Sequence, residues 1–99
     1  MIELMENFDQ RVQDIAMRFP DEVVSIRYFT SYDWTGDPAI YFQVLLSDDA
    51  TKASVLGEVT ARVQEELFDK LQLRRSDYAP YFYFRGKSEQ DEMKDPAWA

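Results

Sequence analysis

The chain has 99 residues, of which 45% are hydrophobic and 15% aromatic, so it has material for one domain with one core. Its 19 acidic and 11 basic residues give a net charge of −8, which disfavours binding to nucleic acid and to anionic membrane surfaces. The absence of cysteine and histidine excludes disulfides, zinc–thiolate sites and the most common general base.

The first predicted element is an amphipathic helix that ends before Pro20. Its apolar residues recur at spacings of three and four, which places them on one face of a helix. Proline disfavours helical backbone in the residue that precedes it. The predicted buried stripe is Met5, Phe8, Val12, Ile15 and Phe19.

Two strands are predicted next, over residues 23–29 and 39–46. Both are rich in β-branched and aromatic residues whose pattern alternates along the chain. The segment between them, residues 30–38, is full of turn formers. Adjacent strands joined by a loop of this length most simply form an antiparallel hairpin.

A long second helix is predicted up to about Leu73. Ser47, Asp48 and Asp49 offer side chains that cap a helix N-terminus, so we expect the helix to begin there. Gly57 inside it marks a kink or a close contact, because glycine weakens a helix interior. The predicted apolar stripe is Leu56, Val59, Val63, Leu67 and Leu71, widened by Val55 and Phe68.

The last predicted strand covers residues 78–85, where Phe82 and Phe84 alternate with Tyr81 and Tyr83. Pro80 lacks an amide donor and suits an edge position or the beginning of a strand. Residues 87–99 are polar and have the composition of a flexible C-terminal tail. We therefore expect a single domain over residues 1–86, followed by that tail.

The element order α-β-β-α-β predicts an α+β fold with a three-stranded sheet and two helices packed on one face. The second helix is a crossover, so the second and third strands are either parallel neighbours or separated by the first strand. The side chains expected to face the helices are Val24, Ile26, Tyr28, Ile40, Phe42, Val44, Phe82 and Phe84.

The opposite face of the predicted sheet is unusually aromatic for bare surface. It is expected to carry Val23, Phe29, Tyr41, Leu45, Tyr81 and Tyr83, with Arg27, Gln43 and Arg85 among them. Three occupants would explain it: another protein or a second copy of the chain, the tail folded back with Trp98, or single-stranded RNA stacked on the rings. The net charge favours a protein partner and makes nucleic acid unlikely.

The loop over residues 30–38 holds two further candidates. Trp34 is a candidate contact residue, because exposed tryptophan is enriched in interface hot spots. Asp33 and Asp37 have oxygen ligands that suit a hard cation, but aspartate, glycine and proline are also ordinary turn residues. We expect a plain hairpin loop, with no metal site and no cofactor.

Catalytic candidates are few. Ser47, Ser54, Ser76 and Ser88 have no histidine to activate them, and the pair Glu65–Glu66 is expected on a solvated helix surface. The chain is therefore not expected to be an enzyme. The N-terminus is acidic and no apolar run approaches the roughly 20 residues of a membrane span, so we expect a cytoplasmic protein.

Two resemblances bear on function. The stretch Asp33-Trp34-Thr35-Gly36-Asp37-Pro38-Ala39, with the aromatic strand Pro80–Phe84, resembles a group of small uncharacterised bacterial proteins of toxin–antitoxin-like gene pairs. That resemblance implies no catalytic residues. The element order, with Glu66–Arg75 before a strand, is similar to ribosome-binding factor A, a type II KH-like protein, but the GXXG loop is absent and the chain is acidic.

Together these features predict a non-enzymatic acidic interaction protein, antitoxin-like or regulatory, that binds a partner protein, forms a homodimer, or does both. The alternative is a KH-like RNA- or ribosome-associated factor. The expected partner-binding residues are Phe29, Trp34, Tyr41, Leu45, Tyr81, Tyr83 and Trp98.

Overall fold

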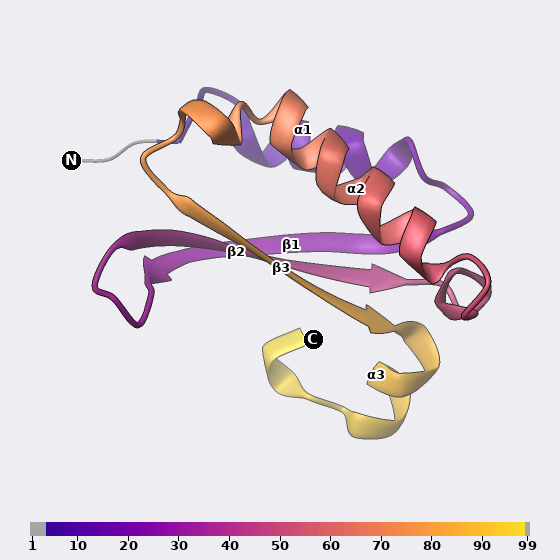
Figure 1. Ribbon diagram of the computed structural model, residues 1–99. Helices are drawn as coiled ribbons and strands as arrows, with labels where there is room; N and C mark the ends of the chain where they lie inside the picture. Colours follow the sequence, from indigo (N-terminus) through magenta and orange to yellow (C-terminus); the bar gives the residue numbers. More distant parts are fainter. Residues whose placement is uncertain (1–3, 99) are drawn as a thin grey trace.

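The computed structural model describes residues 4–98, which form three strands and three α-helices in an α+β arrangement (Figure 1). In chain order these are α1 (Phe8–Met17), β1 (Val23–Tyr32), β2 (Pro38–Leu46), α2 (Leu56–Lys70), β3 (Ala79–Gly86) and α3 (Lys87–Met93). Short 3₁₀ turns lie at Asp49–Thr51, Leu73–Arg75 and Pro96–Trp98. The predicted fold class is confirmed, with a short C-terminal helix added to the expected order.

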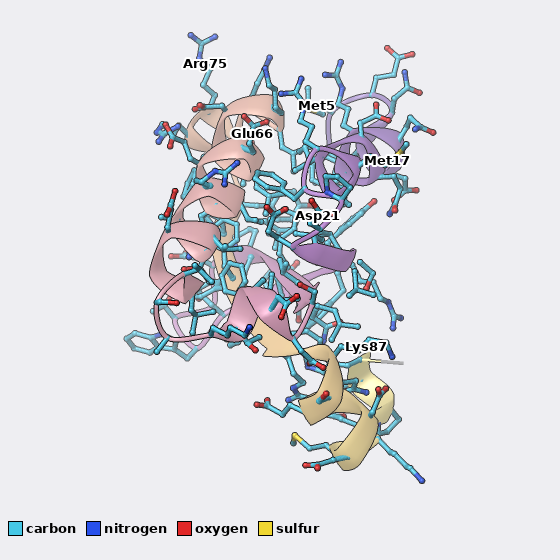
Figure 2. The ribbon with its side chains drawn as sticks, turned by 90° about the vertical axis from the view of Figure 1, so that its right-hand side faces the viewer. Met5, Met17, Asp21, Glu66, Arg75 and Lys87 are labelled. Carbon is cyan, nitrogen blue, oxygen red and sulfur yellow. The ribbon has the colours of Figure 1, made fainter. Side chains whose placement is uncertain are left out.

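The sheet has the strand order β1-β2-β3, with β2 in the centre. β1 and β2 form the expected antiparallel hairpin, whereas β3 runs parallel to β2 because α2 carries the chain across. α1 and α2 cover one face of the sheet, and α3 lies on the other side (Figure 1). The side view agrees, with Met17 of α1 and Lys87 of α3 on opposite sides of the sheet (Figure 2).

The core lies between the sheet and the two long helices, and Phe42 is at its centre. Phe42 is fully buried, and its ring stacks on that of Phe82 in β3, with 5.3 Å between centroids. The ring of Phe8 in α1 stacks on the Phe42 ring as well, with 6.5 Å between their centroids. The buried residues of α2 are Val59, Val63 and Leu67, as its predicted stripe requires. The buried residues of the helices and the strands therefore form one hydrophobic cluster.

The predicted orientation of Val23 and Val24 is wrong. Val23 is buried and Val24 is 48% exposed, the reverse of the expectation. The pairing of β1 with β2 shifts between Val23 and Ser25, which marks a β-bulge. A bulge inserts one extra residue into a strand and so breaks strict alternation of side chains. Val23 therefore belongs to the core and not to the opposite face.

The second helix begins later than predicted. Ser47, Asp48 and Asp49 lead into the 3₁₀ turn, where Ser47 Oγ accepts a hydrogen bond from the backbone N–H of Ala50 at 3.3 Å. α2 starts at Leu56, after Val55, and no side chain caps it. Val55 and Leu56 are each 36% exposed, so these two residues of the predicted apolar stripe are not part of the buried face of α2.

The segment after Gly86, expected as a polar flexible tail, instead forms α3 and the turn Pro96–Trp98 in the structure. Asp48 anchors the start of α3 by accepting hydrogen bonds from Ser88, at 3.0 Å from the backbone N–H and 2.5 Å from Oγ. These bonds hold the pKa of Asp48 below its ordinary value. Composition alone cannot predict these bonds, because they join residues that are far apart in the sequence.

Candidate functional site

The register of the strands arranges the face of the sheet opposite α1 and α2 into rows that run across all three strands. We call this the outer face. One row is Phe29, Tyr41 and Tyr81, and the next is Arg27, Gln43 and Tyr83. Toward the hairpin turn lie Ser31, Ala39 and Ala79, and toward α3 lie Ser25, Leu45 and Arg85. Five of the predicted partner-binding residues, Phe29, Tyr41, Leu45, Tyr81 and Tyr83, therefore share this face.

Phe29, Tyr41 and Tyr81 form a continuous stack, which we call the aromatic row. The centroids of Phe29 and Tyr41 are 5.1 Å apart with 15° between the ring planes, and those of Tyr41 and Tyr81 are 5.1 Å apart with 17°. Tyr83 stacks on Tyr41 at 6.2 Å. Tyr41 is therefore stacked on both faces, whereas Phe29 and Tyr81, at the ends of the row, each stack on Tyr41 through one face. Phe29 and Tyr83 remain 48% and 50% exposed.

The hairpin turn is attached to the aromatic row through Asp33. Tyr81 Oη donates a hydrogen bond to Asp33 Oδ2 at 3.0 Å. The other carboxylate oxygen, Oδ1, accepts bonds from Thr35 Oγ1 at 2.5 Å and from the backbone N–H groups of Thr35 and Asp37 at 2.9 and 3.1 Å. The bonds from Thr35 and Tyr81 hold the pKa of Asp33 below its ordinary value. The same carboxylate raises the pKa of Tyr81.

Trp34 sits at the tip of this braced turn and is 91% exposed. Gly36 supports the turn with a φ of +87°, and its backbone N–H donates to the carbonyl of Asp33 at 2.9 Å. Positive φ costs glycine little, whereas other residues are strained there. The indole therefore projects from a rigid turn, and a preordered aromatic side chain loses little entropy on binding.

The remaining predicted contact residue, Trp98, lies at the other end of the outer face. Its ring packs against the Arg85 guanidinium, 4.6 Å from the ring centroid. Arg85 also pairs with Asp95 at 3.1 Å and with Glu89 at 3.5 Å. The C-terminal segment runs back beneath the sheet at this end (Figure 1). It covers the Arg85 end of the outer face and leaves Phe29 and Tyr83 open.

Sequence reasoning missed two features of this surface. Asp33 was considered as a cation ligand, but its oxygens are engaged by the turn and by Tyr81. Within residues 4–98 no cluster of three or more acidic side chains is placed to hold a metal ion. The second feature is the lack of an ion pair at Arg27: this residue, expected on the outer face, is exposed beside the aromatic row and pairs with no acidic group of the described residues.

A separate hollow of about 640 Å³ lies where α2, β3 and α3 meet. Leu46, Leu56 and Phe84 contribute apolar walls, and Thr60 and Glu89 are among its polar residues. Arg85 also borders it, but the guanidinium is held by Asp95 and Glu89. No serine–base pair or carboxylate pair converges on it among its lining residues, so the outer face is the stronger candidate site.

Comparisons with protein-family models, with curated proteins and with solved structures find no significant match to this chain. The resemblances to toxin–antitoxin-like proteins and to KH-like factors therefore stay predictions from sequence. Among residues 4–98, no helix is both long enough and apolar enough to cross a membrane.

Proposed function

We propose that this chain is a non-enzymatic, acidic interaction protein, antitoxin-like or regulatory, whose outer face binds a partner protein or a second copy of the chain. The observation that carries the proposal is the open aromatic row with Tyr83 beside it. Half-exposed rings at Phe29 and Tyr83 share this face with Arg27, which has no ion pair among residues 4–98, and interfaces are enriched in aromatic residues and arginine.

The proposed partner of the outer face is a basic protein. The net charge is −8, and acidic groups border the outer face at both ends, at Asp37 near the turn and at Glu89 in α3. Opposite charge speeds encounter and fixes orientation. An acidic protein of this kind can cover the nucleic-acid-binding surface of a basic partner, which is what an antitoxin-like or regulatory role requires.

RNA binding, the alternative, is less well supported by the same surface. Proteins that bind single-stranded RNA offer the faces of aromatic rings to the bases. Here Tyr41 lies between Phe29 and Tyr81 in a stack, so its faces are already used. The negative charge also opposes contact with phosphates.

Affinity capture with matched variants tests the proposal. The full chain is compared with Tyr83→Glu, which places a charge on the outer face, and with Met17→Glu, which places the same charge on α1, where Met17 is 75% exposed. We expect one protein to be captured by the unmodified chain and by Met17→Glu, and to be lost with Tyr83→Glu. Capture that Tyr83→Glu does not reduce would contradict a role for this face.

The RNA alternative has its own readout. A single-stranded oligouridine titrated into the chain at low and moderate salt should show no binding. Affinity that falls steeply with added salt and disappears in Tyr83→Glu would instead support the KH-like alternative.

A further inference from the structure

The outer edge of β1 is an unprotected strand edge. β1 is an edge strand of the described sheet, and from Ser25 to Tyr32 it contains no proline, glycine or lysine and a single charge, Arg27. Natural sheets usually protect such edges with these residues, with bulges or with covering segments. The other edge strand, β3, carries Pro80 and is followed directly by α3. β1 has a bulge at Val24, but its edge from Ser25 to Tyr32 has no such device and is suited to pairing with another strand.

The hairpin geometry identifies the backbone groups that this edge offers. The backbone N–H of Asp33 donates to the carbonyl of Asp37 at 2.9 Å, so these two residues form a hydrogen-bonded pair. Hydrogen-bonded pairs alternate with non-bonded ones along an antiparallel ladder. Phe29 therefore bonds inward to β2, and the free edge presents the N–H and C=O groups of Ile26, Tyr28 and Thr30. It also presents the N–H of Tyr32, whose carbonyl accepts a 3.5 Å hydrogen bond from Tyr41 Oη.

We infer that a second copy of the chain pairs along this edge, β1 against β1 and antiparallel, with the two-fold axis at Phe29. In this register Tyr28 exchanges backbone hydrogen bonds with Thr30 of the second copy, and the Ile26 carbonyl accepts a bond from the N–H of Tyr32 of the second copy. The bulge at Val24 stays outside the paired segment. The result is one continuous six-stranded sheet, made from two copies of three strands.

The side chains on the outer face favour the axis at Phe29. The two Phe29 residues form a non-hydrogen-bonded pair, in which side chains approach most closely. Each Phe29 ring is stacked on Tyr41 on one side and is 48% exposed. The pairing therefore joins the two aromatic rows into a single stack across the whole sheet.

Charge selects the same register. With the axis at Phe29, Arg27 lies opposite Ser31 of the second copy and diagonal to its Asp33, within reach of a long side chain. Arg27, which forms no ion pair among residues 4–98, thus gains the charge of a carboxylate that keeps its bonds to the turn and to Tyr81, twice in the symmetric dimer. An axis at Arg27 would instead place two guanidinium groups side by side. An axis at Tyr28 would bring the bulged Val24 into the paired segment.

The helices leave room for this pairing. α1 covers the first part of β1, since the backbone N–H of Val23 bonds to Phe19 and the ring of Phe8 packs on Tyr28 at 4.8 Å. Thr30, Ser31 and Tyr32 are exposed, and the hairpin turn extends beyond the helices (Figure 1). The two-fold axis sets the covered part of each β1 beside the uncovered part of the other. The two α1 helices are then offset along the strands rather than superposed.

Single cysteines test the register, because the chain has none of its own. Cα atoms of a non-hydrogen-bonded pair are about 4.5 Å apart, which a disulfide can span. Phe29→Cys should therefore form a disulfide-linked dimer in a glutathione redox buffer. Ser31→Cys is the matched control on the same face, and its two cysteines would be roughly 13 Å apart. Equal cross-linking of both variants, or of Ser31→Cys alone, would overturn the inference.

Sedimentation of the full chain tests the edge itself, in moderate salt to screen repulsion between chains of charge −8. Thr30→Pro removes an edge N–H that makes no bond to β2, and Thr30→Lys adds an edge charge if the proline disturbs folding. Each should weaken dimerisation about tenfold or more, whereas Thr30→Val should not. A monomer at high micromolar concentration, or a dimer that both variants leave intact, would refute edge pairing.

This inference and the proposed function fail separately. Tyr83→Glu should leave the edge dimer intact while it abolishes partner capture. If Tyr83→Glu dissociates the dimer and the Thr30 variants do not, the copies meet face to face and the edge inference is wrong. If the unmodified chain forms the edge dimer but captures no partner protein, only the proposed partner role is refuted.

Discussion

Tyr81 donates a hydrogen bond from its phenol to Asp33 Oδ2 at 3.0 Å and so ties β3 to a turn 48 residues earlier in the chain. The turn belongs to the hairpin of β1 and β2, so this single bond connects the two outer strands of the sheet. It also fixes the end of the aromatic row against the turn that carries Trp34. The rigidity of the candidate interface therefore depends on one carboxylate.

Replacing Asp33 should loosen the hairpin. Asp33→Asn keeps the size of the side chain but loses the charge that Thr35, Asp37 and Tyr81 all bond to. We expect a lower urea midpoint of unfolding and faster amide exchange in residues 33–37. Asp37→Asn is the control, because Asp37 Oδ2 accepts only a 3.2 Å bond from Thr35 among the described residues. An equal effect of both changes would contradict this account.

The contribution of Asp33 should disappear in acid. Its pKa is lowered in the folded chain, first by the Thr35 hydroxyl, so the ionised form stabilises the fold. That stability is fully present above the ordinary aspartate pKa of about 3.9 and is lost as the pH falls through the lower folded value. The stability difference between the unmodified chain and Asp33→Asn should therefore shrink below about pH 4. Urea titrations from pH 6 to pH 2.5 measure it.

Tyr28 should titrate late. Burial, with a hydrogen bond to Asp9 as a second cause, raises the pKa of Tyr28 to about 12. Stability from the neutral phenol is then fully present below the ordinary tyrosine pKa of about 10 and is lost as the pH rises through the folded value. Ultraviolet titration should show a late phenolate transition that is missing in Tyr28→Phe. If Tyr28→Phe instead lacks a transition near the ordinary tyrosine pKa, the pKa of Tyr28 is not raised in the folded chain.

The periodicity of the sequence was sufficient to place the two long helices, though not the start of α2, together with the strands and most of the outer face. Each sheet face repeats every two residues, so Tyr41, Tyr81 and Tyr83 could be assigned together from alternation alone. Alternation failed at Val24, because a bulge adds a residue without a distinctive local signal. The order of the strands was left open, because a crossover helix permits both arrangements.

Features that depend on distant contacts were not accessible from sequence patterns. The bond between Tyr81 and Asp33 and the anchor between Asp48 and Ser88 join residues 48 and 40 positions apart. α3 was missed for the same reason, since polar composition alone describes a flexible end. Alternation placed Arg27 on the outer face, but only the structure shows that it forms no ion pair within residues 4–98.

The core should respond to truncation at its centre. Phe42 is fully buried, and its ring stacks on rings from both α1 and β3. Phe42→Ala therefore removes the side chain that packs the helix layer against the sheet. We expect a loss of about 3–5 kcal/mol in the free energy of unfolding. Met17→Ala, at a position 75% exposed, should change it by less than about 0.5 kcal/mol. Urea unfolding of both variants checks the difference, and a small effect of Phe42→Ala would mean that the core is loosely packed.

The C-terminal segment should detach when its contact with Arg85 is lost. Arg85 is 16% exposed at its side chain, pairs with Asp95 and packs on Trp98, so it holds the turn after α3 against the sheet. Trp98→Ala removes a cation–π contact worth about 0.5–1 kcal/mol, too little to unfold the domain but enough to release the segment. Limited proteolysis should then cleave after Met93 faster than in the unmodified chain. Lys87→Ala, which breaks the exposed pair with Asp91, should leave that rate unchanged. If cleavage in Trp98→Ala is no faster, the contact between Arg85 and Trp98 is not what holds the segment in place.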